Sequence, residues 1–475
     1  MEFINILSNI LFVLALSYYF MTTMQWYSYK LERVLFHHTK MWWNLVYFLI
    51  PLIAYFLFHK YFGLSIIITV VYIGALYQWK QGLDKPLVFT GRVKRFFAAL
   101  VFFTLFIVML KFSGVQYESV AVLIPLFLAY MVSAMMEKML FLGFKNRAEK
   151  KLESMPNMIV VGITASYGKT SIKNYIAHLL SKKYKTYATP RSVNTFGGVL
   201  KDINDDLPAD TEVYVVEMGA RGKGDIKEIT KFVNPHYAIV GKIGPAHIEY
   251  FRTLEKIRNT KMEIIASDRL KAAWVDRSAK VQPVAHIYEF GKEVSGVQST
   301  LDGLSFEMDG EIYEANILGS FNAMNIGLAI KVAKALEVDD EMIKAQLKTL
   351  EPTAHRLQRM DAGGKLIIDD SFNGNIDGMM EGFNLSSTYE GRKVLITPGL
   401  VEVDDEMNVE VAKRANEVFD LVVVTGDLNY PIFKEHVEAS KLVKLESKDK
   451  MQEMLVEQTR EGDLILFAND APSFI

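Results

Sequence analysis

Residues 168–171, Gly-Lys-Thr-Ser, are the part of the sequence best suited by type and spacing to phosphate chemistry. A β-branched run at 157–163 predicts a buried strand before them, and the pattern at 171–183 predicts a helix after them. In such a strand–loop–helix unit, backbone N–H groups and the helix N-terminus face an anion. The lysine reaches the outer phosphates and the threonine hydroxyl reaches Mg²⁺. The sequence therefore predicts a nucleotide site that includes Gly168, Lys169, Thr170 and Ser171.

The glycine spacing of this loop is unusual. The common phosphate-loop pattern places a glycine five residues before Gly168, where this chain has Ile163, and the nearest glycine is Gly162. The longer form, which runs from Gly162 through Thr164 to Thr170, resembles the ATP loop of the Mur ligase family.

Further segments resemble the same family, in the same order along the chain. They match its MurF branch in particular, through the EMG, IGPAH and DDSFN versions of the family motifs. The matching segments are 213–219 (VYVVEMG), 243–249 (IGPAHIE), 259–264 (NTKMEI), 319–325 (GSFNAMN), 355–357 (HRL) and 369–375 (DDSFNGN).

The resemblance implies a role for each matching residue. ATP would be bound by Thr164, Gly168, Lys169, Thr170, Ser171, Asn322, Asn325, Arg356, Asp370 and Asn373. Mg²⁺ ions would be held by Thr170, Glu217, His247 and a carbamylated Lys261. Lys169, His247 and Lys261 would act in catalysis, and Asn194, in the segment 191–198, would contact the substrate.

Each of these residues also has an ordinary structural interpretation. Glu217 could cap a helix, a lone histidine such as His247 is most often a structural hydrogen-bonding group, and Lys261 could be a solvated surface lysine. A carboxylate at a strand end beside a phosphate loop nevertheless suits Mg²⁺, which prefers oxygen ligands.

The implied activity is ATP-dependent amide ligation in peptidoglycan precursor synthesis. The γ-phosphate of ATP would convert a substrate carboxylate into an acyl phosphate, and an amine would then displace the phosphate. In the MurF branch, D-alanyl-D-alanine is joined to the UDP-linked N-acetylmuramoyl tripeptide, so the resemblance implies these two substrates.

Before residue 140 the sequence has the character of a membrane domain. About twenty apolar residues in a helix span a bilayer, and shorter runs tilt little or enter only part of the way. The third and fourth of five runs are short. The runs are 5–22, 42–58, 64–77, 96–110 and 120–136.

The charges between these runs predict an orientation. Several basic residues follow the first, third and last runs, whereas the other two connections carry only Lys60 and Lys111. The positive-inside rule then places the N-terminus outside and everything after residue 140 in the cytoplasm. We expect a multi-pass protein of the cytoplasmic membrane, in contact with the bilayer, with membrane-bound enzymes of peptidoglycan synthesis as candidate partners.

Composition supports this division of the 475 residues. Residues 1–140 hold 11 Lys and Arg against 5 Asp and Glu, so the chain's net charge of −2 combines a basic part with an acidic one. That balance argues against nucleic acid as a partner. The chain has no cysteine, which excludes disulfides and thiolate chemistry.

The expected fold is an α-helical membrane domain of about five spans at 1–144, followed by α/β domains. A central ATP-binding domain with a phosphate loop would occupy 145–351. A smaller Rossmann-like C-terminal domain would occupy 352–475, with strands at 365–370, 393–397, 421–425 and 463–467.

The sequence departs from the MurF pattern in several places. The spans stand where that branch has its uridine-binding domain, Ala165 and Phe321 replace the usual glycine and histidine, and the Lys-Gly-Ser-Arg stretch common near the C-terminus is absent. Two alternatives stay open: a Mur-type ligase of another polymer, such as poly-γ-glutamate, and a non-catalytic membrane scaffold or transporter with a nucleotide site.

Overall fold

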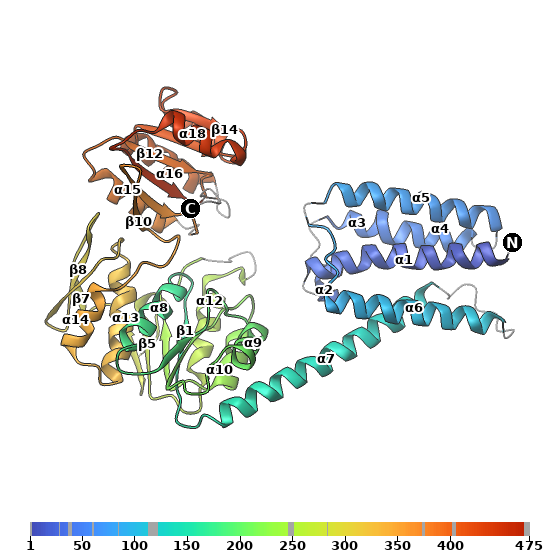
Figure 1. Cartoon of the computed structure of the whole chain (residues 1–475), viewed down its shortest axis with the longest axis horizontal. Helices are drawn as coiled ribbons and strands as arrows, with labels where there is room; N and C mark the ends of the chain where they lie inside the picture. The colour runs from blue at the N-terminus through green and yellow to red at the C-terminus, as the bar shows by residue number, and fades with distance from the viewer. Residues whose placement is uncertain are drawn as a thin grey trace. The chain divides into compact units, whose positions relative to one another are not determined.

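The computed structural model describes residues 2–27, 29–36, 40–58, 61–83, 85–112, 122–245, 251–282, 284–372, 376–400 and 405–469 (Figure 1). The chain divides into two compact units, Met1–Asn146 and Arg147–Ile475.

Helices are the regular secondary structure of the first unit's described part. Four of its helices are long and apolar enough to cross a membrane: α1, α5, α6 and α7. The elements are α1 (Glu2–Trp26), α2 (Leu31–Phe36), α3 (Trp42–Asn44), the π-helical η1 (Leu45–Leu49), α4 (Ile50–Phe58), α5 (Phe62–Gln81), α6 (Gly91–Phe112) and α7 (Leu123–Glu153).

The lengths of these helices correct one expectation. The third and fourth apolar runs lie in helices of 20 and 22 residues, because Lys80, Arg92 and other polar residues extend them beyond the apolar stretch. The second run, Trp42–Phe58, is instead the short one, and a π-helical turn interrupts it. The described residues thus provide four helices of spanning length where five spans were expected.

Side chains divide between a packed interior and an apolar exterior in this unit. Phe12 stacks on Tyr55 inside the bundle, with ring centroids 4.3 Å apart, and the hydroxyls of Ser8 and Thr69 are hydrogen-bonded at 2.9 Å. Outward-facing side chains such as Phe102 and Met109 are more than 60% exposed. A bundle that is apolar on both sides is typical of helices in lipid, where polar groups must find partners inside.

A parallel six-stranded sheet forms the centre of the second unit. Its strand order is β2-β3-β1-β4-β5-β6. Its strands read as continuous apolar runs because helices cover both faces. The strands are β1 (Ile159–Thr164), β2 (Thr186–Ala188), β3 (Val213–Glu217), β4 (Tyr237–Val240), β5 (Ala272–Asp276) and β6 (Ile287–Phe290).

Helices on the two faces of this sheet enclose separate cores. On one face, Ile163 packs with Ile172 of α8 (Lys169–Leu180) and Ile326 of α13 (Asn322–Ala335). On the other, Val216 packs against α9 (Phe196–Asp205) and α10 (Asp225–Val233). The same region contains α12 (Leu254–Lys261), η2 (Met262–Ala266), η3 (Arg277–Ala279) and α14 (Asp340–Lys348). An antiparallel sheet is formed by β7 (Val294–Thr300), β8 (Gly303–Met308) and β9 (Glu311–Ala315).

A second six-stranded sheet lies toward the C-terminus (Figure 1), in the order β10-β11-β15-β12-β13-β14, with β10 the antiparallel edge strand. The four strands expected here are β11 (Lys365–Asp370), β12 (Lys393–Thr397), β13 (Leu421–Thr425) and β15 (Leu464–Ala468). The sequence did not reveal β10 (Gln358–Ala362) and β14 (Leu442–Leu445). The helices are α15 (Ile376–Ser387), α16 (Asp405–Val418), α17 (Tyr430–His436), η4 (Lys448–Lys450) and α18 (Met451–Gln458).

These elements agree with the predicted α/β class after the helical region. The expected division of the second unit near residue 351 stays a prediction, as do the other domain boundaries.

Candidate active site

The phosphate loop joins β1 to α8 at the carboxyl edge of the central sheet. Gly168 caps the N-terminus of α8 with a left-handed backbone, φ 78°. A Cβ at this position would lie 2.8 Å from Oδ1 of Asn325 on α13. Glycine is therefore required both by the backbone conformation and by the close approach of Asn325.

The segment after β4 holds the outer side of the loop. The backbone N–H of Ser166 donates to the carbonyl of Lys242 at 2.9 Å, and the Ser166 hydroxyl donates to the carbonyl of Gly244 at 2.9 Å. A Cβ on Gly244 would approach the ring of Tyr167 to 2.5 Å. The loop is thus fixed to the chain that leads toward residue 247.

Lys169 folds back over its own loop. Its ammonium donates to the carbonyls of Ala165, at 2.9 Å, and Ser166, at 3.2 Å. Burial lowers its pKa and the neighbouring Arg356 lowers it further, while Glu217 opposes the shift. A cation at this place can meet the outer phosphates of a nucleotide bound in the loop.

Glu217, the last residue of β3, lies directly beside this loop and is 1% exposed. Its Oε2 accepts from the Thr170 hydroxyl at 2.9 Å, and its Oε1 accepts from the Asn194 amide at 3.0 Å. The ammonium of Lys173, one turn along α8, is 3.8 Å from Oε2. We refer to Thr170, Lys173, Asn194 and Glu217 as the Glu217 cluster.

Lys261 ends α12 as a buried residue, 4% exposed. Desolvation lowers its pKa to about 7, the positive charge of Lys169 adds to the shift, and Glu217 and Asp225 oppose it. A substantial share of this side chain is therefore the neutral amine near neutral pH. A solvated surface lysine, the ordinary interpretation of its sequence context, would be protonated at this pH.

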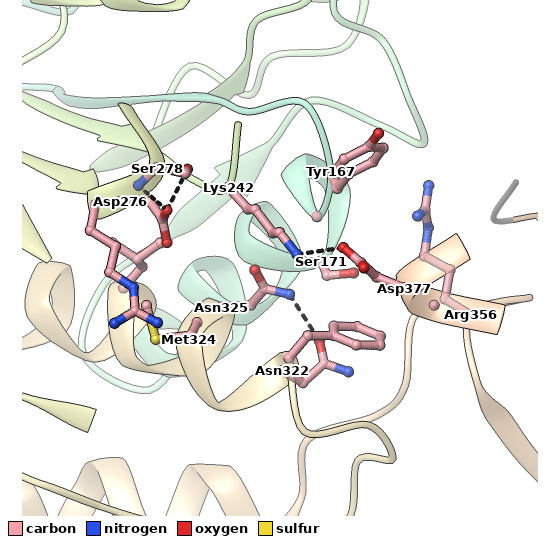
Figure 2. A pocket seen from close by; sticks show the side chains of 15 residues that line it. Tyr167, Ser171, Lys242, Asp276, Ser278, Asn322, Met324, Asn325, Arg356 and Asp377 are labelled. Atoms are coloured by element: carbon pink, nitrogen blue, oxygen red, sulfur yellow. Dashed lines mark hydrogen bonds and ion pairs between the residues drawn. The ribbon is translucent and has the colours of Figure 1, made fainter. Parts of the chain in front are cut away.

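A cavity of about 390 Å³ opens beside the loop (Figure 2). Apolar side chains of Phe321, Met324 and Leu328 form part of its wall. Polar groups complete the wall: Asp276 comes from β5 of the central sheet, and Asp377 comes from α15, a helix beside the second sheet. Its further lining residues are Tyr167, Gly168, Ser171, Lys242, Arg277, Ser278, Asn322, Asn325, Arg356 and Gly378.

Two asparagines at the start of α13 form a small network within this lining. Oδ1 of Asn322 accepts from Asn325 at 3.0 Å and from the Tyr175 hydroxyl at 3.2 Å, and its amide donates to the carbonyl of Leu318 at 2.7 Å. Asn325 therefore reaches from Asn322 (Figure 2) to the close approach at Gly168.

Arg356 enters the cavity from a strained segment. Its neighbours His355 and Leu357 both have left-handed backbones, φ 62° and 46°. Asp370 behind it accepts from the Leu357 N–H at 3.2 Å, and its Oδ2 is buried and has no hydrogen-bond partner among the residues that the structure describes. Burial raises the pKa of Asp370 to about 8 against the opposing effect of Arg356.

The structure thus brings the predicted residues into two adjoining places. Five line the cavity: Gly168, Ser171, Asn322, Asn325 and Arg356. Thr170, Glu217 and Asn194 join in the Glu217 cluster. Thr164 differs from the rest, because its buried hydroxyl donates to the carbonyl of Met218 and ties β1 to the segment after β3.

His247 and Asn373 lie outside the described residues. Within the described part of the chain, no three His, Asp or Glu side chains gather into a metal site. The predicted metal set depends on His247 and a modified Lys261 in addition to Thr170 and Glu217.

Several lining residues were missed by sequence reasoning. Lys242 and Asp377 form an ion pair at 2.5 Å, and Asp276 accepts from the Ser278 hydroxyl and N–H (Figure 2). Asp276 could have been predicted from the sequence, because it ends a buried strand at the edge where ligands of α/β sheets bind. Lys173, which belongs to the Glu217 cluster and not to this lining, could not have been found from sequence, since its sequence neighbours do not indicate that it is buried.

Known proteins share this arrangement. Residues 163–333 match the model of the Mur ligase middle domain. The chain is 27% identical to a Bacillus subtilis protein named UDP-N-acetylmuramoyl-tripeptide–D-alanyl-D-alanine ligase, over 65% of this chain and 72% of that protein. A Synechocystis protein of the same name is 26% identical over 51% of this chain, and the match covers 55% of its own length.

Solved structures agree. MurF from Acinetobacter baumannii superimposes with a TM-score of 0.60 at 22% identity, covering 69% of this chain and 77% of that one. MurF from Thermotoga maritima in complex with ADP gives a TM-score of 0.57 at 25% identity, covering 68% and 80%. The middle-domain match, the relatives and the solved structures together support a Mur ligase of the MurF type with an apolar helical extension at its N-terminus.

Proposed function

We propose that this protein is a membrane-anchored ATP-dependent ligase that joins D-alanyl-D-alanine to UDP-N-acetylmuramoyl-tripeptide. One observation carries the proposal: the carboxylate of Glu217 and the hydroxyl of Thr170 meet at 2.9 Å, beside a phosphate loop whose Lys169 interacts electrostatically with the same carboxylate. The names of the relatives supply the two substrates.

The residues of the loop serve phosphoryl transfer. An amine cannot displace oxide from a free carboxylate, so the terminal carboxylate of the tripeptide first takes the γ-phosphoryl group of ATP. ADP leaves, and the amine of the dipeptide then displaces phosphate from the acyl phosphate. Lys169 and Arg356 neutralise charge on the phosphates, while the N–H groups at the start of α8 orient them.

The donor set of the Glu217 cluster fits Mg²⁺. A carboxylate and a hydroxyl at the edge of a phosphate site are hard oxygen ligands. Thr170 and Glu217 would hold the ion, which supplies neutralisation of charge on the phosphoryl oxygens. Asn194 keeps one carboxylate oxygen of Glu217 in place and would lie close to the substrate.

A second Mg²⁺ would be held by His247 and by the carbamate of Lys261. The buried amine of Lys261 supports this modification, because only a neutral amine attacks CO₂ and its pKa is about 7. Asn322, Asn325, Asp370 and Asn373 would complete the ATP site, with the side chains of α13 facing the base.

The apolar helices are long enough to cross a membrane. The basic residues that follow the first, third and last apolar runs would place the N-terminus outside and the catalytic region in the cytoplasm. An anchored ligase would work beside the membrane-bound steps that use its product. The enzymes of those steps are the candidate protein partners, and nucleic acid is not a partner in this proposal.

A single reaction tests the proposed function. Purified full-length protein in detergent is mixed with ATP, Mg²⁺, UDP-N-acetylmuramoyl-tripeptide and D-Ala-D-Ala, and the product is identified by mass. We expect the UDP-linked pentapeptide and one ADP for each amide bond. Protein that binds ATP but forms no pentapeptide would disprove this substrate assignment, and glutamate polymer made from glutamate and ATP would support the alternative ligase.

A further inference from the structure

Lys173 is a buried cation that the proposed mechanism does not use. Its side chain is 2% exposed, although a lysine is rarely found buried unless it is paired. It lies on α8 one turn after Lys169. Both ammonium groups interact electrostatically with Glu217, but among the cations of the described residues only Lys173 forms an ion pair with its carboxylate.

The hydrogen bonds of Lys173 go to a different segment. Its ammonium donates to the carbonyl of Thr189, at 2.6 Å, and to the carbonyl of Arg191, at 2.5 Å. Arg191 has a left-handed backbone, φ 48°, and an exposed side chain. The Lys173 ammonium thus holds the strained turn at residues 189–191 by the carbonyls of its first and last residues.

This turn carries Asn194 to the Glu217 cluster. The carbonyl of Asn194 accepts from the N–H of Gly219 at 2.7 Å, and its amide donates to Glu217. A Cβ on Gly219 would lie 2.7 Å from the Asn194 side chain, so the fit is close. The segment 189–194 is therefore attached at one end to Lys173 and at the other to the carboxylate.

We propose that Lys173 is a positioning residue that fixes the segment 189–194 and Glu217 relative to the phosphate loop. The inference rests on the proposed function, in which Glu217 binds the metal and Asn194 lies close to the peptide substrate. The Lys173 ammonium donates two hydrogen bonds to carbonyls and lies 3.8 Å from Oε2 of Glu217. It therefore balances the charge of the carboxylate and leaves the carboxylate oxygens available to other donors. Asp202, which accepts from the hydroxyls of Tyr187 and Tyr214, is the other acid near this ammonium.

The alternative is that Lys173 only stabilises the fold. A matched control separates the two, because Lys183, just beyond the end of α8, also donates to two backbone carbonyls, those of Leu336 and Glu337. Lys183→Met removes the same kind of bond away from the Glu217 cluster. Lys173→Met removes charge and donors, and Lys173→Arg restores the charge with a different shape.

The first readout is independent of the reaction. Trypsin cleaves after an exposed arginine when its backbone opens, and Arg191 is held by Lys173. We expect cleavage after Arg191 in native full-length protein to accelerate about tenfold or more in Lys173→Met, because a charged hydrogen bond is lost. The cleavage rate of Lys173→Arg should lie between those of Lys173→Met and the wild type, and Lys183→Met should be cleaved at the wild-type rate. Equal cleavage of Lys173→Met and wild type would overturn the proposal.

The second readout is a double-mutant cycle in kcat/KM for the UDP-linked tripeptide. Lys173→Met and Asn194→Ala should each lower it, and the double variant should lose less than the product of the two losses, since both act on one segment. If the loss of kcat/KM in the double variant equals the product of the two single losses, positioning through Asn194 is contradicted. If Lys173→Met fails to fold, Lys173→Arg with Asn194→Ala provides the cycle. A wild type without ligase activity would refute the proposed function and leave the proteolysis result standing.

Discussion

In the proposed mechanism, Lys169 is the residue on which phosphoryl transfer depends most directly. Because its ammonium is held inside the loop by two carbonyls, it is already oriented before a nucleotide binds. We expect Lys169→Met to lower kcat by about 10²–10³-fold, the effect typical of losing one oriented charge stabiliser. The measurement is ADP release coupled to amide formation. Lys185→Met is the control, because Lys185 pairs with Asp210 on the surface, and a few-fold loss in Lys169→Met would contradict the assigned role.

Lys261 provides a prediction about pH. Its pKa lies at about 7, below the ordinary value for lysine, so its charged form dominates only below that pH. The fraction able to react with CO₂ therefore rises as the pH increases through 7, whereas exposed lysines stay protonated until about pH 10. We expect a carbamate signal in ¹³C NMR with labelled bicarbonate at pH 8 that weakens toward pH 6.

The matched pair for this experiment lies on one helix. Lys261→Met should remove the carbamate signal, and Lys256→Met, at an exposed position of α12, should keep it. A signal that survives in Lys261→Met would assign the carbamate to another residue.

The positions of site residues were predictable from sequence where the backbone sets them. Gly168, Thr170 and Glu217 follow from a strand end or a helix start, so their positions near one another depend on local structure. Lys173 depends instead on carbonyls 16 and 18 residues away, and nothing in its own neighbourhood indicates that contact. Thr164 matched a motif, yet its hydroxyl is engaged within the sheet, and its assignment to ATP stays a prediction.

At the scale of elements, the turn into α8 is the most constrained feature of the site. In Gly168→Ala we expect a loss of roughly 1–2 kcal/mol in unfolding free energy from the left-handed backbone alone. The KM for ATP should also rise, because Asn325 must move to admit the Cβ. Chemical denaturation and initial rates measure the two effects.

A glycine in a helix serves as the comparison. Gly143 lies within α7, and a Cβ there would meet nothing within 4 Å, so Gly143→Ala should leave the KM for ATP unchanged. A normal ATP KM in Gly168→Ala would show that the contact with Asn325 is not needed for nucleotide binding.

The buried elements could be predicted and the marginal ones could not. β1, β12 and β13 are continuous apolar runs, and α8 shows a helical repeat. β10 is a polar edge strand with an exposed arginine and aspartate, and it exists because β11 pairs with it. The π-helical turn at Leu45–Leu49 has no sequence signal, since every residue there suits an α-helix in lipid.

For the whole molecule, orientation in the membrane is the central prediction. The chain lacks cysteine, so a single introduced one reports its own location. In intact cells, an impermeant maleimide should label Phe3→Cys, near the N-terminus. Lys182→Cys, at an exposed position beyond α8, should be labelled only after the membrane is opened. Labelling of Lys182→Cys in intact cells would reverse the proposed topology.

The wall of the nucleotide cavity has a consequence for inhibitor selectivity. Phe321 lines the cavity with Met324 and Leu328, at a position where the resemblance to MurF implies a histidine. A compound whose aromatic group stacks on Phe321 gains an apolar ring contact. A histidine at the same position would offer a more polar ring. The volume of about 390 Å³ suits a small drug-like molecule. Competitors of ATP built against this ring would therefore discriminate between this enzyme and relatives that carry the histidine.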